Sequence, residues 1–458
     1  MSFIGGLPAR LRPLQLGTRQ CKAGPTFLGV LPRSSGRQAD RDFRSFALTA
    51  NPARFASLRP FSRLAGRCAV AGAVALAGLV ASAGLVGCST TRPEVAIERG
   101  ELDPGSFEVA WRVDVPERLG DVKRMALRDD FLFAYSDNNS VQAISVEGGT
   151  TRFITDRIVG PRETLRAPVI IETLGRLGSN QDRVLVFPSS KTMVVTTLDG
   201  QVIRNSPLKY GTTSGSIQSA GLIYTATSSN YGGRIAKIDP LKPAAQVVDE
   251  VQVDGAINST PAVFQRTIFA ADSQGEIYGI TEGMNQAWDQ KSFRVERDIT
   301  AGLAADEYGV YVAGQDGVLY VLDRQRGKLK WRYFNDAPLY RTPVPTSRMV
   351  FLATGTSVVA LDKLDGAMTS REPKWVVDGA VGFLSHDDSR VYLLLGDGHI
   401  GAFDKQSGEE LFRSKRNDFV KFAQNRGGSR IFAYTPDGSL IAIDPVTQRK
   451  YGEMAMLD

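Results

Sequence analysis

The stretch that decides the fold is Val310-Tyr-Val-Ala-Gly-Gln-Asp316-Gly317-Val-Leu-Tyr-Val-Leu-Asp323, with Gly327 and Trp331 behind it. Two apolar runs separated by a polar Asp-Gly pair predict a β-hairpin, and we expect a type I′ turn because glycine readily adopts positive φ. The two runs place strands B and C of this unit at Val310–Ala313 and Val318–Leu322. Strand A is expected near residues 300–304 and strand D at 329–333.

The same unit recurs eight times, and each copy ends its second apolar run on a polar closing residue. The closing residues are Ser145, Thr197, Asp239, Thr281, Asp323, Asp362, Asp404 and Asp444, at steps of 52, 42, 42, 42, 39, 42 and 40 residues. A period near 42 with four short strands per unit is typical of a β-propeller blade. The sequence therefore predicts an all-β fold over residues 107–458, an eight-bladed propeller of four-stranded antiparallel blades.

Two recurring side chains indicate how a blade is built. Asp occupies five of the eight closing positions, where its carboxylate can accept hydrogen bonds from backbone amides of the next turn. Because it recurs from blade to blade, we interpret it as a turn cap and not as a catalyst. Trp288, Trp331 and Trp375 lie in or near strand D, and we expect each to cover the sheet of the next blade.

The chain must also close its ring, since an open propeller would leave two sheet edges exposed. The segment from Phe107 to Val115 resembles a strand D, with Trp111 matching Trp331, but no A, B or C strand precedes it. We expect it to complete the eighth blade as the outermost strand. The alternative is that residues 449–454 take that place.

The N-terminal part has the order of a secretory signal: Arg59, Arg63 and Arg67, then an apolar run over 69–86, then small residues. The run ends Leu85-Val86-Gly87-Cys88, which resembles a bacterial lipobox. We therefore expect residues 1–87 to be a leader, Cys88 to be the acylated N-terminus (palmitate among its acyl chains), and residues 88–106 to be a tether. The alternative is an uncleaved membrane anchor. Residues 1–58 are either a start assigned too early or a disordered n-region.

Charge distribution argues against a nucleic-acid partner. The formal net charge is +6, but residues 1–87 hold twelve Lys/Arg and only two Asp/Glu. The remaining 43 basic and 47 acidic residues leave the rest of the chain at −4. Nucleic-acid binding needs a basic face, and this body is mildly acidic.

One unit is longer than the others. The first step of 52 residues indicates an insertion around residues 172–183, in the loop between strands A and B of the second blade. This loop contains Gly175, Gly178, Asn180 and Asp182. Inserted loops often carry specificity on a scaffold fold, so these four residues are a candidate interaction element. The alternative is a neutral surface insertion.

The motif from Asp316 to Trp331 resembles the repeat of the pyrroloquinoline-quinone propeller superfamily. Its pattern is Asp-Gly-x-Leu-Tyr-x-Leu-Asp-x-x-x-Gly-x-x-x-Trp. An exported, lipidated propeller with eight such units is most similar to the BamB family of outer-membrane protein assembly factors. The resemblance implies a monomeric, non-catalytic scaffold facing the periplasm at the outer membrane. Its partners would be the membrane itself, through the lipid, and an envelope protein such as a β-barrel assembly protein. The alternative is a sensory propeller with a small ligand in its central channel.

The superfamily also contains quinone-dependent dehydrogenases, but this chain departs from their pattern. Those enzymes resemble one another in a disulfide of adjacent cysteines and a tryptophan in most blades, whereas residues 88–458 hold one cysteine and the chain has four tryptophans. His386 and His399 are the only histidines, and their spacing suits neither a hydrolytic triad nor a zinc site. We therefore expect no enzyme activity, no cofactor, no metal site and no catalytic residue.

Overall fold

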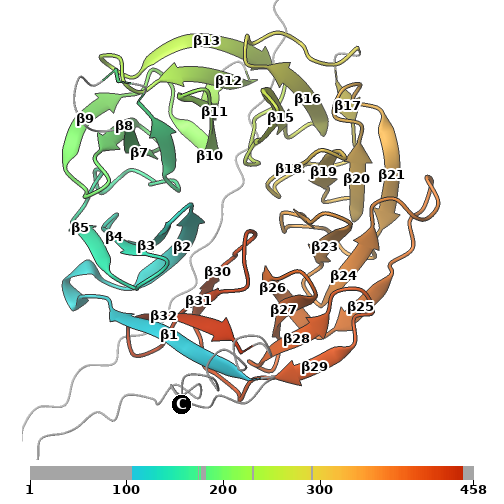
Figure 1. The fold of residues 1–458 in the computed structure, drawn as a ribbon. Helices are drawn as coiled ribbons and strands as arrows, with labels where there is room; N and C mark the ends of the chain where they lie inside the picture. The colour runs from blue at the N-terminus through green and yellow to red at the C-terminus, as the bar shows by residue number, and fades with distance from the viewer. Residues whose placement is uncertain (1–105, 174, 177–181, 230–231, 290–291, 447–458) are drawn as a thin grey trace, which may run out of the picture. The chain divides into compact units, whose positions relative to one another are not determined.

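The structure, a computed structural model, describes residues 106–173, 175–176, 182–229, 232–289 and 292–446. These residues form eight four-stranded antiparallel sheets, which follow one another around a ring in Figure 1. Within each sheet the strands are labelled A to D from the inside of the ring outward, so strand A is innermost and strand D is outermost. No helix among the described residues is long and apolar enough to cross a bilayer.

The eight blades take their strands in chain order, except that the first strand belongs to the last blade. Blade 1 has β2 (Val122–Arg128), β3 (Phe131–Ser136), β4 (Val141–Ser145) and β5 (Thr151–Thr155); blade 2 has β6 (Val169–Glu172), β7 (Arg183–Pro188), β8 (Thr192–Thr196) and β9 (Val202–Pro207); blade 3 has β10 (Thr212–Ser219), β11 (Leu222–Ser229), β12 (Gly232–Asp239) and β13 (Gln246–Val253); blade 4 has β14 (Ala262–Phe264), β15 (Thr267–Ala271), β16 (Glu276–Thr281) and β17 (Phe293–Arg294). Blade 5 has β18 (Ala304–Ala305), β19 (Val310–Ala313), β20 (Val318–Leu322) and β21 (Leu329–Phe334); blade 6 has β22 (Val344–Pro345), β23 (Met349–Ala353), β24 (Ser357–Asp362) and β25 (Trp375–Asp378); blade 7 has β26 (Ala380–His386), β27 (Arg390–Leu395), β28 (Ile400–Asp404) and β29 (Glu410–Arg413); blade 8 has β30 (Lys421–Ala423), β31 (Ile431–Tyr434), β32 (Ser439–Pro445) and β1 (Phe107–Asp114). A short 3-10 helix, η1 (Glu117–Leu119), follows β1.

The predicted eight-bladed propeller is confirmed. In blade 5 the two central strands have the bounds expected from the sequence, and strand D extends one residue further. Strand A is shorter and lies at Ala304–Ala305. The central strands are the easiest to predict because both faces of β19 and β20 are fully buried, so every position in them is apolar.

The expected type I′ turn is wrong. Gly317 has a φ of 82°, but Asp316 does not have positive φ. The Gly317 amide donates to the Gly314 carbonyl at 3.2 Å, and the Gly314 amide donates to the Val318 carbonyl at 3.0 Å. These bonds describe a three-residue hairpin loop, a type I turn followed by one left-handed glycine, in which only the glycine needs positive φ.

The predicted role of the closing Asp is confirmed. Asp323 Oδ1 accepts hydrogen bonds from the amides of Gln325 and Arg326 at 3.0 and 2.8 Å. Asp404 repeats the pattern with the amides of Gln406 and Ser407. The carboxylate therefore satisfies backbone donors of the turn between strands C and D, which is a structural role.

Each of the four tryptophans links its blade to the next, as expected, so four of the eight blade junctions carry such a contact. Each indole N–H donates to the carbonyl of the residue that follows the next blade's closing position. The pairs are Trp111 to Val146 at 2.9 Å, Trp288 to Arg324 at 3.0 Å, Trp331 to Lys363 at 3.2 Å and Trp375 to Lys405 at 3.2 Å. At these four junctions one repeated contact therefore combines aromatic burial with a satisfied indole donor.

The ring closes through the first strand. β1 pairs antiparallel with β32, from Phe107 opposite Pro445 to Asp114 opposite Ser439, and the two strands lie side by side in Figure 1 although they come from opposite ends of the colour bar. β1 thus holds the strand D position of blade 8, as expected. The alternative strand at 449–454 lies outside the described residues.

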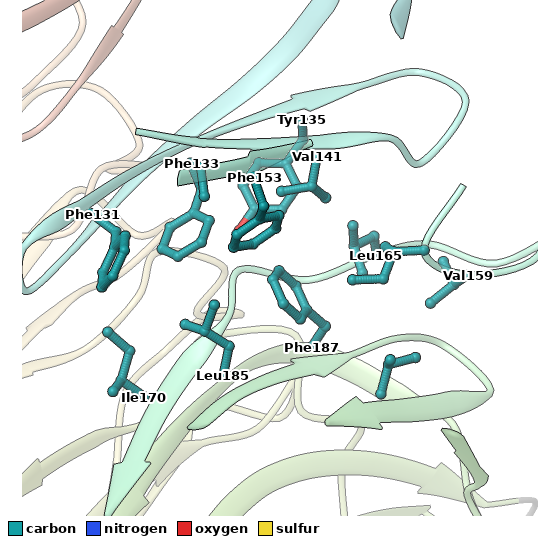
Figure 2. Packing of buried hydrophobic residues seen from close by; sticks show 13 residues of the cluster. Phe131, Phe133, Tyr135, Val141, Phe153, Val159, Leu165, Ile170, Leu185 and Phe187 are labelled. Atoms are coloured by element: carbon teal, nitrogen blue, oxygen red, sulfur yellow. The ribbon is translucent and has the colours of Figure 1, made fainter. Parts of the chain in front are cut away.

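The hydrophobic core is divided into clusters between neighbouring blades. Figure 2 shows the cluster of blades 1 and 2, where Phe131 and Phe133 of β3 face Ile170, Leu185 and Phe187 of blade 2. The rings of Phe133 and Phe187 meet edge to face, with centroids 6.0 Å apart. Each such fully buried side chain contributes about 1.5–3 kcal/mol. Because the clusters span the junctions, blades stabilise one another and not only themselves.

Candidate functional site

The topology sorts all connecting loops onto two faces of the ring. Strands alternate in direction within each blade, so the A–B and C–D connections emerge on one face and the B–C and D–A connections on the other. We call the first the AB–CD face; it carries residues 173–182 of blade 2 and residues 363–374 of blade 6. Both are long connections, and the C–D connection of blade 4, residues 282–292, is of similar length.

The blade 2 loop lies where the sequence placed the insertion, between β6 and β7. Gly175 and Asp182 belong to it, and Asp182 is exposed; Gly178 and Asn180 lie outside the described residues. Arg176, which the sequence did not single out, anchors the loop. Its guanidinium donates to both carboxylate oxygens of Asp239 in blade 3, at 3.1 and 2.9 Å, and to the Gly221 carbonyl at 3.1 Å. The loop therefore bridges two blades.

The blade 6 loop was missed by sequence reasoning. It covers residues 363–374 between β24 and β25, whereas the corresponding turn of blade 5 covers only 323–328. The spacing of closing residues hides it, because a single residue, Gly379, joins β25 to β26 and compensates for the added length. The visible signal is the distance from closing Asp to Trp: thirteen residues from Asp362 to Trp375, against eight from Asp323 to Trp331.

Two large apolar side chains project from this loop into solvent. Leu364 is 72% exposed and Met368 is 66% exposed. The base of the loop is fixed: the Arg371 amide donates to the Arg332 carbonyl at 2.7 Å, and the buried Arg371 guanidinium lies 4.7 Å from the Trp331 ring. An anchored loop that presents exposed Leu and Met has the features of a contact element.

A cavity of about 720 Å³ opens beside this loop on the AB–CD face. The buried Lys363 ammonium in its wall pairs with Asp306 and donates to the Thr346 carbonyl. Lys330 lies 3.6 Å from the centroid of the Tyr308 ring, and burial lowers the pKa of this lysine. Lys330 also donates to the Tyr308 carbonyl at 2.9 Å, so both lysines of this cavity already have partners within the protein.

A larger cavity of about 1520 Å³ occupies the inside of the ring. Its wall includes residues from the A strands of blades 1 to 6 (β2, β6, β10, β14, β18 and β22), residues 424–430 in the A–B loop of blade 8, and residues 146–147 and 444–445. This is the central channel that the sensory alternative requires. Two arginines in its wall, Arg128 and Arg426, are its unusual feature.

The two histidines are not brought into one site. His386 lies at the end of β26, and its ring nitrogens contact the carbonyls of Asp387 and Arg426, both at 3.2 Å. His399 lies in the B–C turn of the same blade, at the opposite end of the sheet, 2.9 Å from Asp397. Within the described residues, no group of three or more His, Cys, Asp or Glu side chains is placed to hold a metal ion. Cys88 lies outside them.

Comparison with known proteins adds the family. The family model of the outer membrane protein assembly factor BamB matches residues 76–284 and 275–380, well over half of the chain. This chain belongs to the BamB family. The predicted resemblance is thereby confirmed, and the family's repeat accounts for the closing Asp and the Trp links. No curated protein sequence matches the chain.

Solved structures agree with the BamB family fold. BamB from Moraxella catarrhalis superposes with a TM-score of 0.55 at 17% identity, covering 74% of this chain and 97% of that one. The computationally designed Ika8 protein gives 0.52 at 13% identity, with 71% and 96% coverage. The C-terminal WD40 domain of Sif2 gives 0.52 at 10% identity, with 75% and 99% coverage. At such low identities these likenesses describe the propeller alone.

Proposed function

We propose that this chain is a non-catalytic, membrane-tethered scaffold of the cell envelope that holds a partner protein during outer-membrane protein assembly. The observation that carries the proposal is the BamB family match over residues 76–380. The eight-bladed ring supports it, because a rigid propeller presents loops from several blades on one face.

The tether is proposed from the leader. Cleavage before Cys88 and acylation there would leave residues 88–106 to connect the lipid to β1, with the propeller over residues 107–458 facing the periplasm at the outer membrane. More than one acyl chain is needed for a firm anchor, because a single chain holds a protein only marginally. Cys88→Ser should accumulate unprocessed precursor without lipid label; an intact peptide across Gly87-Cys88 in the mature wild-type protein would refute this assignment.

The docking surface is proposed on the AB–CD face, where the 173–182 and 363–374 loops lie. Leu364 and Met368 would be the apolar anchors, and Gly175, Gly178, Asn180 and Asp182 would form the polar element of the blade 2 loop. Anchoring by Arg176 and Arg371 supports this assignment, because a loop held at its base loses less entropy when a partner binds.

Co-purification tests the proposal. The tagged full chain, extracted from its own envelope in mild detergent, should retain a β-barrel assembly protein. Leu364→Asp combined with Met368→Asp should abolish that retention without lowering the melting temperature, since both side chains are exposed. Leu411→Asp on β29, 46% exposed on the outer rim, is the matched control and should retain the partner. Unchanged retention by the double variant would reject the docking surface, and no retention by the wild type would reject the scaffold role.

A quinone-dependent enzyme is the competing function within the superfamily. The single cysteine of residues 88–458 and the four tryptophans of the chain argue against it. We expect no dye reduction when pyrroloquinoline quinone, Ca²⁺ and an alcohol are added to the purified chain. Turnover, or quinone binding at a defined stoichiometry, would overturn the non-catalytic assignment.

A further inference from the structure

The central cavity is lined by seven charged side chains, and most of them have an oppositely charged neighbour. The charged lining residues are Arg128, Asp129, Glu147, Asp306, Arg426, Arg430 and Asp444. Three carboxylates have an ion pair: Asp129 with Arg183 at 2.7 Å, Asp306 with Lys363, and Asp444 with Arg430 at 2.7 Å. The hydrogen bond from Arg430 to Asp444 raises the pKa of Arg430. The charge of the fourth carboxylate, Glu147, raises it further by a smaller amount.

Arg128 and Arg426 differ from the others, because their hydrogen bonds reach only neutral groups. Arg128 donates to the carbonyls of Pro168 and Leu127 at 3.2 and 2.8 Å. Arg426 donates to Gln424 Oε1 at 3.3 Å. In the part of the chain that the structure describes, neither arginine forms an ion pair with a carboxylate. Two guanidinium groups therefore line the cavity without a negative partner.

These two charges also repel each other. Arg426 is accessible from the cavity, yet surrounding protein partly desolvates it, and this desolvation followed by the charge of Arg128 lowers the pKa of Arg426. A third arginine, Arg124, lies two side chains along the same face of β2, 5.5 Å from the Tyr135 ring. The Tyr135 hydroxyl beside these arginines is buried and has no hydrogen-bond partner. Arg124 and Tyr135 do not line the cavity, so its positive charge at this wall comes from Arg128 and Arg426.

Like charges held together without a counterion make the unoccupied state less favourable, and an anion that binds between them removes that penalty. The planar guanidinium fork matches the oxygens of a carboxylate or a phosphate. A volume of about 1520 Å³ also exceeds the roughly 300–1,000 Å³ of ordinary small-molecule pockets, so a metabolite-sized ligand has room together with water.

We infer that the central cavity is a binding site for a small oxyanion, a carboxylate or phosphate compound, held by the guanidinium groups of Arg128 and Arg426. The inference is independent of the scaffold role, because Arg128 lies at the end of the inner strand β2 and Arg426 in the A–B loop of blade 8, and neither belongs to the 173–182 and 363–374 loops of the docking surface. Ligand binding here would make the propeller responsive to a periplasmic anion.

Calorimetric titration of the purified full chain tests the site with two probes, citrate and inorganic phosphate, at constant ionic strength. The carboxylate and phosphate arms distinguish the two ligand chemistries. At least one probe should bind saturably with a stoichiometry of one, and Arg128→Met or Arg426→Met should weaken it about tenfold or more, the usual effect of losing a charged hydrogen bond. Arg152→Met, at an exposed arginine on the outer strand of blade 1, should leave affinity unchanged.

Melting temperatures without ligand give a second readout. Arg426→Met should raise the melting temperature, since it removes the repulsion with Arg128, whereas loss of an ordinary structural arginine would lower it. The same variant should lose the stabilisation that the bound probe gives to the wild type. Absence of saturable binding of both probes to the wild type, or equal affinity in the wild type and the Arg128→Met/Arg426→Met double variant, would overturn the inference.

Discussion

The junction between blades 5 and 6 and the junction between blades 8 and 1 use the same contact under different constraints. Trp331 donates to the Lys363 carbonyl at 3.2 Å, and Trp111 donates to the Val146 carbonyl at 2.9 Å. In blade 5 a six-residue turn, residues 323–328, joins strand C to the strand D that carries the tryptophan. In blade 8 strand D is β1, which comes from the other end of the propeller sequence and is joined to β32 by no covalent turn.

Side-chain bonds replace the missing turn in blade 8. Ser439 donates to Asp114 Oδ1 at 2.8 Å, and Arg112 Nε donates to Ser439 Oγ at 3.1 Å. Arg430 binds Asp444 and also donates to the Val146 carbonyl of blade 1 at 2.7 Å. The comparison teaches that a repeated junction keeps its geometry without chain continuity when polar contacts hold the loose strand in register.

Deleting β1 breaks the comparison most severely. Removal of residues 89–114 should cost the fold more than about 5 kcal/mol, a large share of an ordinary domain's stability, because β32 becomes an open edge and two blade junctions lose Phe107 and Trp111. Removal of residues 89–104 should leave stability unchanged, since β1 stays intact. Urea unfolding of both truncations measures the difference; equal midpoints for both and for the untruncated body would show that β1 does not close the ring.

Tryptophan substitutions sharpen the comparison between the two junctions. Trp331→Ala should cost about 3–5 kcal/mol, the range for a large buried aromatic. Trp111→Ala should cost a similar amount and should also increase hydrogen exchange along β32, because β1 has no covalent turn to keep it paired. Trp331→Phe and Trp111→Phe, which keep an aromatic ring but lose the indole donor, are the controls and should cost less. If hydrogen exchange increases only along the strand that carries the substituted tryptophan in both variants, the proposed difference between the two junctions is contradicted.

Most of the fold was predictable because the strands and turns of a blade follow from apolar runs and glycines within its own short stretch of sequence. Val310–Ala313 and Val318–Leu322 were located to the residue, since a fully buried strand must be apolar throughout and glycine marks its end. Strand A at Ala304–Ala305 was misplaced, because two paired residues leave no periodic pattern. The turn at Asp316-Gly317 was assigned the wrong type because Asp-Gly occurs in both turn classes, and only the φ of the Asp distinguishes them.

The candidate site was less predictable. The 173–182 loop changed the repeat length and was found, but its anchor to Asp239 needs the position of blade 3. The 363–374 loop left the repeat length unchanged, so the sequence shows it only as the longer distance from Asp362 to Trp375. The cavity brings Arg128 of β2 and Arg426 of the blade 8 A–B loop into one lining although they are almost three hundred residues apart, which no local pattern records.

Glycine substitutions in the B–C turns of blades 5 and 8 distinguish the cost of backbone strain from the cost of steric crowding. A Cβ added at Gly317 of blade 5 would lie 2.5 Å from the Asn335 carbonyl oxygen, whereas one added at Gly438 of blade 8 would meet nothing within 4 Å. Both glycines have positive φ, 82° and 87°. Gly438→Ala should therefore cost about 1 kcal/mol from backbone strain alone, and Gly317→Ala about 2–3 kcal/mol, since backbone must also shift. Equal losses in thermal unfolding would contradict this.

The smallest effects concern a recurrent ion pair between the start of strand B and the end of strand C. Arg430→Met should cost about 2 kcal/mol, because the half-buried Asp444 loses its partner and blade 1 loses a donor. Arg348→Met in blade 6 should lower the melting temperature less, since Arg348 is 56% exposed and, among the described residues, its guanidinium binds Asp362 alone. If Arg348→Met lowers the melting temperature more than Arg430→Met does, the junction between blades 8 and 1 does not depend on its arginine more than blade 6 does.

The Arg348 effect should depend on pH in a defined direction. Burial acts to raise the pKa of Asp362, but the hydrogen bond from Arg348 and those from the Leu364 and Asp365 amides hold that pKa below its ordinary value. A carboxyl with a depressed folded-state pKa stabilises the fold above its unfolded pKa of about 4 and loses that contribution as pH falls through the lower folded value. The melting-temperature gap between wild type and Arg348→Met should thus be constant above about pH 5 and shrink toward zero in more acidic buffer. A gap that widens on acidification would show that Arg348 acts by packing its stem and not by holding the Asp362 carboxylate ionised.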